Sequence, residues 1–151
     1  MTTKISKAVI LATLMLGTTL LMFTPAAEAQ AVVAYSISFT DGQVNLDVRP
    51  GASGVGCTEM VVSNEGQAAI DVDVSISGGG VTISPGAVSV TLGSGGSITV
   101  PVCALALTQS SYKNVQVTAL ASGRESNTQL NSVNKNAGFA VIIEQYARLS
   151  V

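Results

Sequence analysis

The chain has 151 residues, of which 47% are hydrophobic and 11% charged, with a net charge of −2 and no histidine. This length fits one domain, and a slightly acidic chain without a basic run is a poor ligand for nucleic acid or an anionic membrane surface. Without histidine, Ser-His-Asp and Cys-His catalytic sites are excluded and the commonest zinc ligand is missing. We therefore expect a protein that is not an enzyme and has no cofactor or metal site.

Residues 1–29 have the order of a secretory signal peptide. A short basic start precedes the uncharged, largely apolar residues 8–23, and Ala27-Glu28-Ala29 then places small residues where signal peptidase reads them. The apolar run is shorter than the roughly 20 residues that span a bilayer. We expect cleavage after Ala29 and a mature domain, residues 30–151, that has no membrane span and is secreted or displayed at the cell surface.

Two other kinds of leader fit this segment less well. Lys7-Ala8-Val9 loosely resembles the processing site of archaeal type IV pilins, in which the apolar stretch stays as a filament core. Pro25 and the Ala-x-Ala site favour the secretory signal. A lipoprotein needs a cysteine directly after the apolar run, and the sequence has none there.

A β-hairpin is predicted at the start of the mature domain. Residues 33–39 and 43–49 both alternate apolar and polar side chains. Asp41-Gly42 lies between them and readily takes the positive φ values of a type I′ turn. A two-residue turn there would bring apolar residues together along one face, which specifies the register.

The rest of the mature domain has the two-residue period of β-strands, with turn signals at intervals of about 8–12 residues. A short strand is predicted at 81–83, and residues 104–109 are the one place for a single helical turn. The Gly-rich stretches 78–80 and 93–96 precede strands and have no lysine nearby, which indicates turns rather than phosphate-binding loops. The seven main strands are predicted at 43–49, 57–63, 69–76, 87–92, 97–103, 112–121 and 138–150.

This count predicts an all-β domain, a seven- to eight-stranded immunoglobulin-like β-sandwich. Cys57 and Cys103 are the only cysteines, and an even number in an exported chain predicts one disulfide. In such a sandwich 57–63 and 97–103 are antiparallel neighbours, which brings the two cysteines together. Two free buried thiols stay open as an alternative, and the lack of a C-x-x-C motif argues against a redox site. Pro101 cannot donate a ladder hydrogen bond, so its strand should be an edge strand or bulged there.

A resemblance to known domains rests on four short motifs in residues 43–121. They are Pro50-Gly51, Val62-Ser63-Asn64-Glu65-Gly66, the run from Val81 to Pro85, and the run from Ser97 to Val102 after a Gly-rich turn. In these motifs the chain resembles the immunoglobulin-like and fibronectin-III-like modules of archaeal and bacterial surface proteins and of glycosidase-associated accessory domains. The resemblance covers about half of the chain and implies a β-sandwich without catalytic residues.

Asp71 and Asp73 are the only close pair of carboxylates, the groups that glycosidases use. They lie on the outward face of one predicted strand, where solvated acidic side chains are ordinary. A weak Ca²⁺ site that also uses Glu59 or Glu65 stays open as an alternative.

A polar loop of about 15 residues is predicted at 122–136, and loops of that length are often functional. Its composition is equally that of a mobile loop without a ligand. A domain that binds a surface glycan or a protein through this loop would use the following residues: Arg124, Glu125, Asn127, Gln129 and Lys135. The chain has no tryptophan, which argues against a sugar-stacking face.

The long last strand is the main indication of function. Its distal part, residues 146–151, can outrun its own sheet and add to the edge of a neighbouring subunit, as in donor-strand complementation. The first strand, 32–39, is the other candidate donor, although the predicted hairpin folds it back on its own chain. The side chains predicted for the assembly strand are Phe139, Val141, Ile143, Tyr146, Leu149 and Val151.

We therefore predict a non-catalytic structural protein that assembles with copies of itself into an extracellular filament, pilus or surface layer. The alternative is a monomeric secreted module for adhesion or glycan binding that uses the 122–136 loop. A third hypothesis, a small envelope accessory protein or inhibitor, has no specific sequence feature in its favour.

Overall fold

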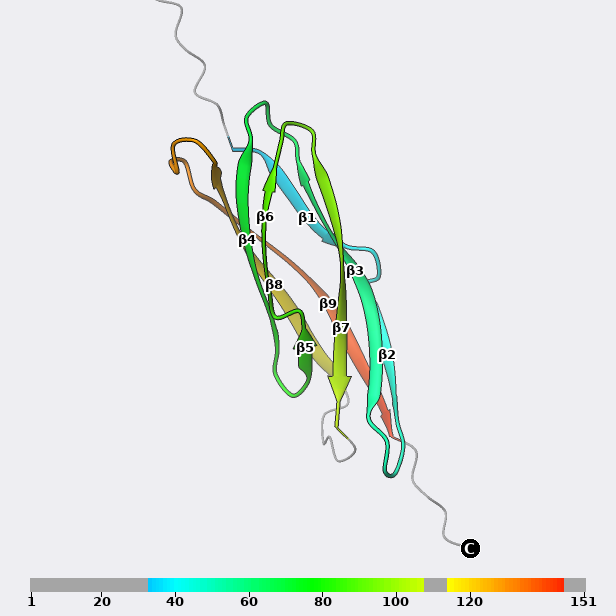
Figure 1. Ribbon diagram of the computed structural model, residues 1–151. Helices are drawn as coiled ribbons and strands as arrows, with labels where there is room; N and C mark the ends of the chain where they lie inside the picture. The colour runs from blue at the N-terminus through cyan, green and yellow to red at the C-terminus, as the bar shows by residue number, and fades with distance from the viewer. Residues whose placement is uncertain (1–32, 108–113, 146–151) are drawn as a thin grey trace, which may run out of the picture. The chain divides into compact units, whose positions relative to one another are not determined.

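The computed structural model describes residues 33–107 and 114–145 (Figure 1). These residues form nine β-strands and no helix. The strands are β1 (Tyr35–Phe39), β2 (Gln43–Val48), β3 (Gly54–Asn64), β4 (Ile70–Gly78), β5 (Thr82–Ser84), β6 (Ala87–Leu92), β7 (Ser97–Ala106), β8 (Asn114–Glu125) and β9 (Val133–Gln145). The predicted signal peptide lies outside the described residues.

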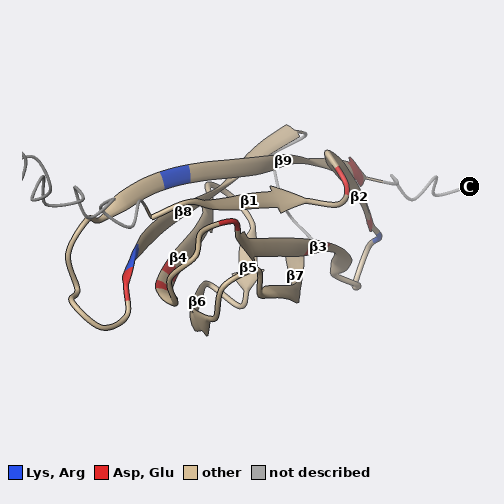
Figure 2. Cartoon of the chain, turned by 90° about the horizontal axis from the view of Figure 1, so that it is seen from above, with Lys and Arg blue, Asp and Glu red and all other residues tan. Residues whose placement is uncertain are grey.

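The strands form two sheets that lie face to face, as Figure 2 shows from above. The order in the four-stranded sheet is β1-β3-β7-β5, and the order in the five-stranded sheet is β2-β9-β8-β4-β6. Alternate residues of each strand point into the space between the sheets. The largest fully buried side chains include Tyr35, Phe139, Leu46 and Met60. The predicted all-β sandwich is confirmed, but the described residues form nine strands rather than the predicted seven to eight, because the first strand and the short strand β5 both join the sheets. No helix in the described part of the chain is long and apolar enough to cross a membrane.

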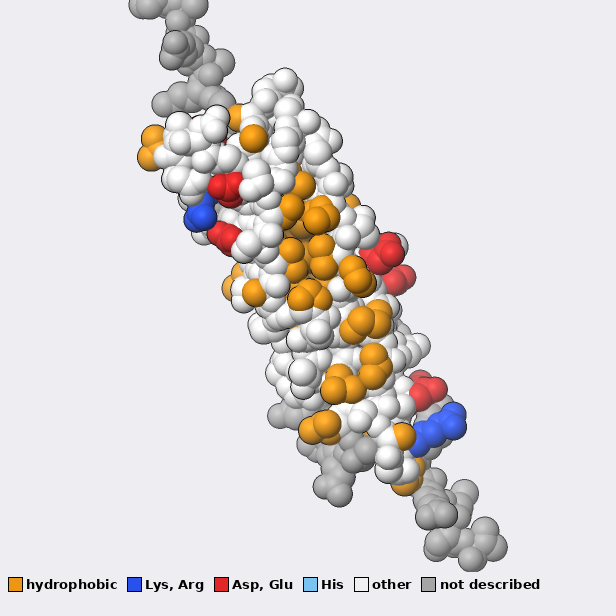
Figure 3. Space-filling model, viewed as in Figure 1, with side chains coloured by type: hydrophobic (Ala, Val, Ile, Leu, Met, Phe, Trp, Pro, Cys, Tyr) orange, Lys and Arg blue, Asp and Glu red, His pale blue; other side chains and the backbone are white. Residues whose placement is uncertain are grey.

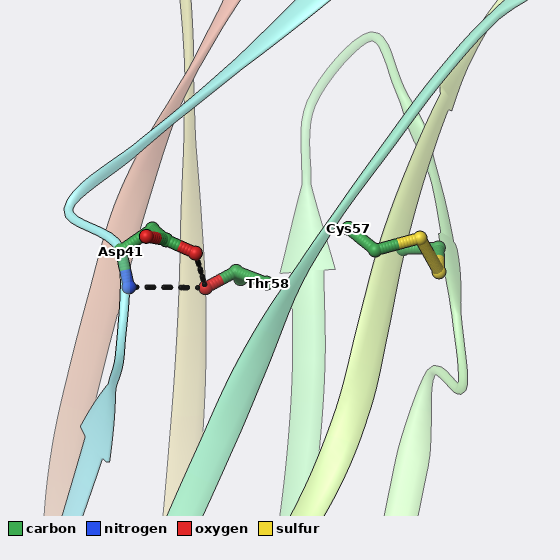
Figure 4. The surroundings of a disulfide bond; sticks show 4 residues. Asp41, Cys57 and Thr58 are labelled. Carbon is green, nitrogen blue, oxygen red and sulfur yellow. Dashed lines mark hydrogen bonds between the residues drawn. A yellow bond between two sulfur atoms is a disulfide. The ribbon is translucent and has the colours of Figure 1, made fainter.

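The hairpin predicted around Asp41-Gly42 is wrong. β1 pairs antiparallel with β3, whereas β2 pairs parallel with β9 in the other sheet. The chain changes sheets at residues 40–42, where the Asp41 N–H donates to Thr58 Oγ1 and the Thr58 hydroxyl donates to Asp41 Oδ2, each at 3.1 Å (Figure 4). The physical reason is that the alternation of apolar and polar residues determines which face of a strand is buried. It does not determine which strand pairs with it. Separate sheets also let Phe39 pack edge-on against Phe139, with 4.8 Å between ring centroids.

β3 and β7 are antiparallel neighbours with Cys57 opposite Cys103, and the predicted disulfide is confirmed (Figure 4). Pro101 lies opposite Glu59. The Glu59 carbonyl accepts from the Thr40 N–H, away from β7, so the Pro101 nitrogen faces the other side of β7. On that side β5 pairs only with residues 103–105, so Pro101 lies on a free stretch of β7, as its sequence position predicts. No turn of helix forms at 104–106, because β7 continues to Ala106.

The polar loop before the last strand is shorter than the predicted 122–136. β8 extends to Glu125 and β9 begins at Val133, so only residues 126–132 connect them. The ladder pairs Gly123 with Val133 and Ser122 with Asn134. Polar residues such as these suit the solvent face of a strand as well as a loop, which is why composition alone misplaced the boundary.

Candidate functional site

One lateral side of the sandwich is open between β6 and β7. β6 is the edge strand of the five-stranded sheet, and among the described residues it pairs only with β4. β7 pairs with β5 only at residues 103–105, so within the described chain its residues 97–102 have no strand on that side. We call this region the open side.

The inward-facing side chains along the open side form an apolar band, which consists of Val88 and Val90 on β6 and Ile98 and Val100 on β7. All four pack against the core but stay partly exposed. Figure 3 looks onto this side and shows hydrophobic side chains gathered between the two strands and along β7. Ala104, farther along β7 where β5 covers it, is fully buried. The band is therefore accessible at a place where no described strand lies beside β6 or beside residues 97–102 of β7.

β6 also presents a regular row of backbone groups to the open side. The Ile76 N–H donates to the Gly86 carbonyl at 2.8 Å, which sets the phase of the β4–β6 ladder. In an antiparallel ladder alternate residues bond to the partner strand. The N–H and C=O groups of Ala87, Ser89 and Thr91 therefore point away from β4. The matching stretch of β7 offers fewer groups, because Pro101 has no N–H.

Asp71 lies on the outer face of β4, beside β6, and anchors the loop that joins β8 to β9. Its Oδ1 accepts from the hydroxyls of Thr91 at 2.8 Å and Ser126 at 2.7 Å, and its Oδ2 accepts from Gln129 Nε2 at 2.9 Å. The hydrogen bonds from Gln129, Ser126 and Thr91 hold the pKa of Asp71 below its usual value. This carboxylate therefore has a structural role in the fold.

Asp73, the second carboxylate of the pair, is held in the same way. It accepts from the Ser89 hydroxyl at 2.6 Å and forms an ion pair with Arg124 at 3.2 Å. Figure 2 shows the acidic residues of β4 beside the basic residue of β8. Glu59, proposed as a further Ca²⁺ ligand, lies on β3 in the other sheet. Among the described residues, no three acidic, cysteine or histidine side chains are grouped so that they could hold a metal ion.

The residues predicted for recognition are divided between two strands and the loop: Arg124 and Glu125 on β8, Asn127 and Gln129 in the loop, and Lys135 on β9. Most of them make contacts within the chain. The Glu125 carboxylate accepts from Thr128 at 2.8 Å and Asn131 at 3.2 Å. Lys135 Nζ lies 5.6 Å from the centroid of the Tyr35 ring. These contacts stabilise the loop and the adjoining strand ends, which leaves fewer free groups for a ligand.

The residues predicted for the assembly strand fall into two groups, one on β9 and one after its end. Phe139, Val141 and Ile143 lie in the core, where they are at most 4% exposed. β9 pairs with β8 on one side and β2 on the other, so this part of the strand is not a sheet edge. Tyr146, Leu149 and Val151 lie outside the described residues. A strand that the C-terminal part of the chain gives to a neighbour is thus limited to the segment after Gln145.

The sequence did not reveal the apolar band. Its four residues alternate with polar residues, as inward-facing residues of any strand do. This pattern does not show whether another strand lies beside them. Pro101 was the one available signal, because proline is confined to edge strands and bulges.

Comparison with solved structures identifies the fold. The ASH/PapD-like domain 7 of human CEP192 is 12% identical, with a TM-score of 0.50, over 83% of this chain and 95% of that domain. The chain has an immunoglobulin-like fold. A CARDB domain from Pyrococcus furiosus, solved in complex with di-metal ions, is 17% identical with a TM-score of 0.46, over 77% of this chain and 97% of that one. Searches against protein-family models and curated proteins return no match.

Proposed function

We propose that this chain is an exported, non-catalytic structural subunit that assembles with copies of itself by β-strand addition. The observation that carries the proposal is the open side, where the unpaired edge of β6 lies beside the apolar band. Strand addition needs both features, because backbone hydrogen bonds give affinity and alternate side chains enter the apolar surface. Proteins that work as monomers usually cover or blunt such an edge.

Other properties of the chain support a structural role outside the cell. The disulfide between Cys57 and Cys103 is typical of proteins that fold in an oxidising compartment. The sequence has no histidine, and both members of its acidic pair are engaged in hydrogen bonds on an outer sheet face. These features support export and argue against catalysis.

The adhesion alternative has less support. It depends on Arg124, Glu125, Asn127, Gln129 and Lys135, and all of these except Asn127 have a described contact within the chain. A recognition loop generally offers its polar groups to the ligand.

Size-exclusion chromatography with light scattering tests the proposal. The natively exported protein is measured without reductant over a hundredfold dilution series. We expect a very large species that persists on dilution, because added strands form long hydrogen-bonded ladders. A sharp peak at the mass of a single chain at every concentration contradicts the proposal.

A further inference from the structure

We propose that residues 146–151 of one copy fill the open side of the next copy, as a strand antiparallel to β6. This inference rests on the proposed function, since it names the donor and the acceptor of the same assembly.

The residue pattern of the donor segment fits the acceptor. Ala147, Leu149 and Val151 alternate with Tyr146, Arg148 and Ser150, so an extended segment has one wholly apolar face and one face with polar groups. The apolar face would enter between Val88 and Val90 on one sheet and Ile98 and Val100 on the other, and would complete their burial.

The charges of donor and acceptor are also complementary. When Leu149 faces the apolar band, Arg148 lies on the outer face of the five-stranded sheet. Asp71 and Asp73 lie on that face, one strand farther in, and the Asp73 side chain is 47% exposed. Arg148 is the only charged residue in the donor segment. Its position on the same face as these two carboxylates, two strands away, favours this alignment over one that points Leu149 outward.

The strand directions allow copies to stack without inversion. β9 is antiparallel to β8, β8 to β4, and β4 to β6, so β9 runs opposite to β6. A donor antiparallel to β6 therefore keeps the direction of the β9 it continues. The last residues of β9 lie beside the first residues of β8, at one end of the five-stranded sheet. The last residues of β6 lie beside the first residues of β4, at the opposite end of the same sheet. Copies translated along the strands would form a head-to-tail contact that does not close, which produces a filament.

β6 is a better acceptor than the free stretch of β7. Ala87, Ser89 and Thr91 each direct both backbone groups to the open side, whereas Pro101 interrupts the row on β7. Moreover, a segment antiparallel to β6 would run parallel to β7, and parallel pairing is slightly less stable per residue.

A proline scan of the two edges tests the acceptor. Ser89→Pro removes an N–H that faces the open side and keeps the β4 ladder. Ser89→Ala is the matched control, because it loses the hydroxyl bonded to Asp73 but keeps the N–H. Thr99→Pro makes the equivalent change on β7. We expect Ser89→Pro to give folded monomers with the disulfide formed, while Ser89→Ala and Thr99→Pro assemble like the wild type.

The donor is tested independently of β6, so a folding defect in Ser89→Pro does not decide the question. Leu149→Asn places an amide on the apolar face and should abolish assembly. Ser150→Asn makes a comparable change on the polar face and should assemble. If Leu149→Asn assembles as well as Ser150→Asn, the donor assignment is wrong.

Mixing a chain that lacks the donor with a chain that lacks the acceptor tests both assignments together. A chain without residues 146–151 keeps the acceptor, and Ser89→Pro keeps the donor. Each should be monomeric alone, and the mixture should form a one-to-one dimer. Polymers from either chain alone, or a monomeric mixture, overturn the inference. If the wild type is itself monomeric, the proposed function fails; if the wild type and Ser89→Pro both polymerise, only this inference fails.

Discussion

The ring of Tyr35 lies directly against Gly123, so a Cβ atom on residue 123 would come 2.5 Å from the ring carbon Cε1. Tyr35 is fully buried, and its hydroxyl lies 2.8 Å from the Val133 carbonyl oxygen and 3.1 Å from that of Ala121. Burial raises the pKa of Tyr35. The contact ties β1 of one sheet to β8 and β9 of the other.

We predict that Gly123→Ala lowers the free energy of unfolding by about 1–3 kcal/mol, because the added methyl group displaces a ring that is fixed by packing and a hydrogen bond. Urea denaturation measures the change. Gly79→Ala is the control, since no atom lies within 4 Å of its Cβ position. Equal stability of the two variants would show that Tyr35 has room to move.

Removing the disulfide should destabilise the sandwich without disturbing its core. The bond joins residues separated by 46 positions, and closing a loop of that length stabilises a fold by about 4 kcal/mol on the chain-entropy model. Cys57 is exposed, so the double variant Cys57→Ala/Cys103→Ala loses little packing. We expect denaturant unfolding to show a loss of this order. A loss below about 1 kcal/mol would mean that the unfolded chain is already compact.

Acid should release the 126–132 loop through Asp71. The folded pKa of this carboxylate is below its ordinary value of 3.8, so its contribution to stability is present above that pH and is lost as pH falls through the folded pKa. Thermal unfolding between pH 6 and pH 2 should show a smaller acid-dependent loss in Asp71→Asn than in the wild type. Asp47→Asn, at an exposed position on β2, should behave like the wild type.

Asn64→Ala should be among the most damaging single substitutions. The Asn64 side chain is buried and joins two turns. Its Oδ1 accepts from the Gly66 N–H at 2.9 Å, and its Nδ2 donates, at 2.8–3.1 Å, to the carbonyls of Ala68, Leu92 and Gly93. Each buried group left unpaired costs about 1–3 kcal/mol, whereas water can replace the bond at an exposed group such as the Gly93 carbonyl. We therefore expect a loss of at least about 3 kcal/mol by urea denaturation. Asn45→Ala, at an exposed position, should change stability by less than about 0.5 kcal/mol.

The positions of the strands were predictable because apolar side chains alternate with polar ones wherever one face of a strand is buried. Ile70, Val72, Val74 and Ile76 were expected inside, and all four are buried on β4. The disulfide was predictable because it needed only the adjacency of β3 and β7, which an immunoglobulin-like strand order provides.

Strand partners could not be predicted in the same way. Residues 33–39 and 43–49 bury the same side chains in a hairpin and in two separate sheets, so the pattern fits both. Asp41-Gly42 can form a tight turn, but Asp41 instead bonds to Thr58 where the chain crosses between sheets. The sequence also did not show that β6 is an edge strand. The exposure of Val88 and Val90 depends on whether another strand lies beside β6, and the residues of β6 do not determine that.

Cryo-electron microscopy of the natively exported protein would show whether one subunit supplies a strand to the next. We predict filaments in which each subunit has one extra strand beside β6, continuous with β9 of an adjacent subunit. Single particles without filaments, or filaments in which the β6 edge has no added strand, would contradict the claim.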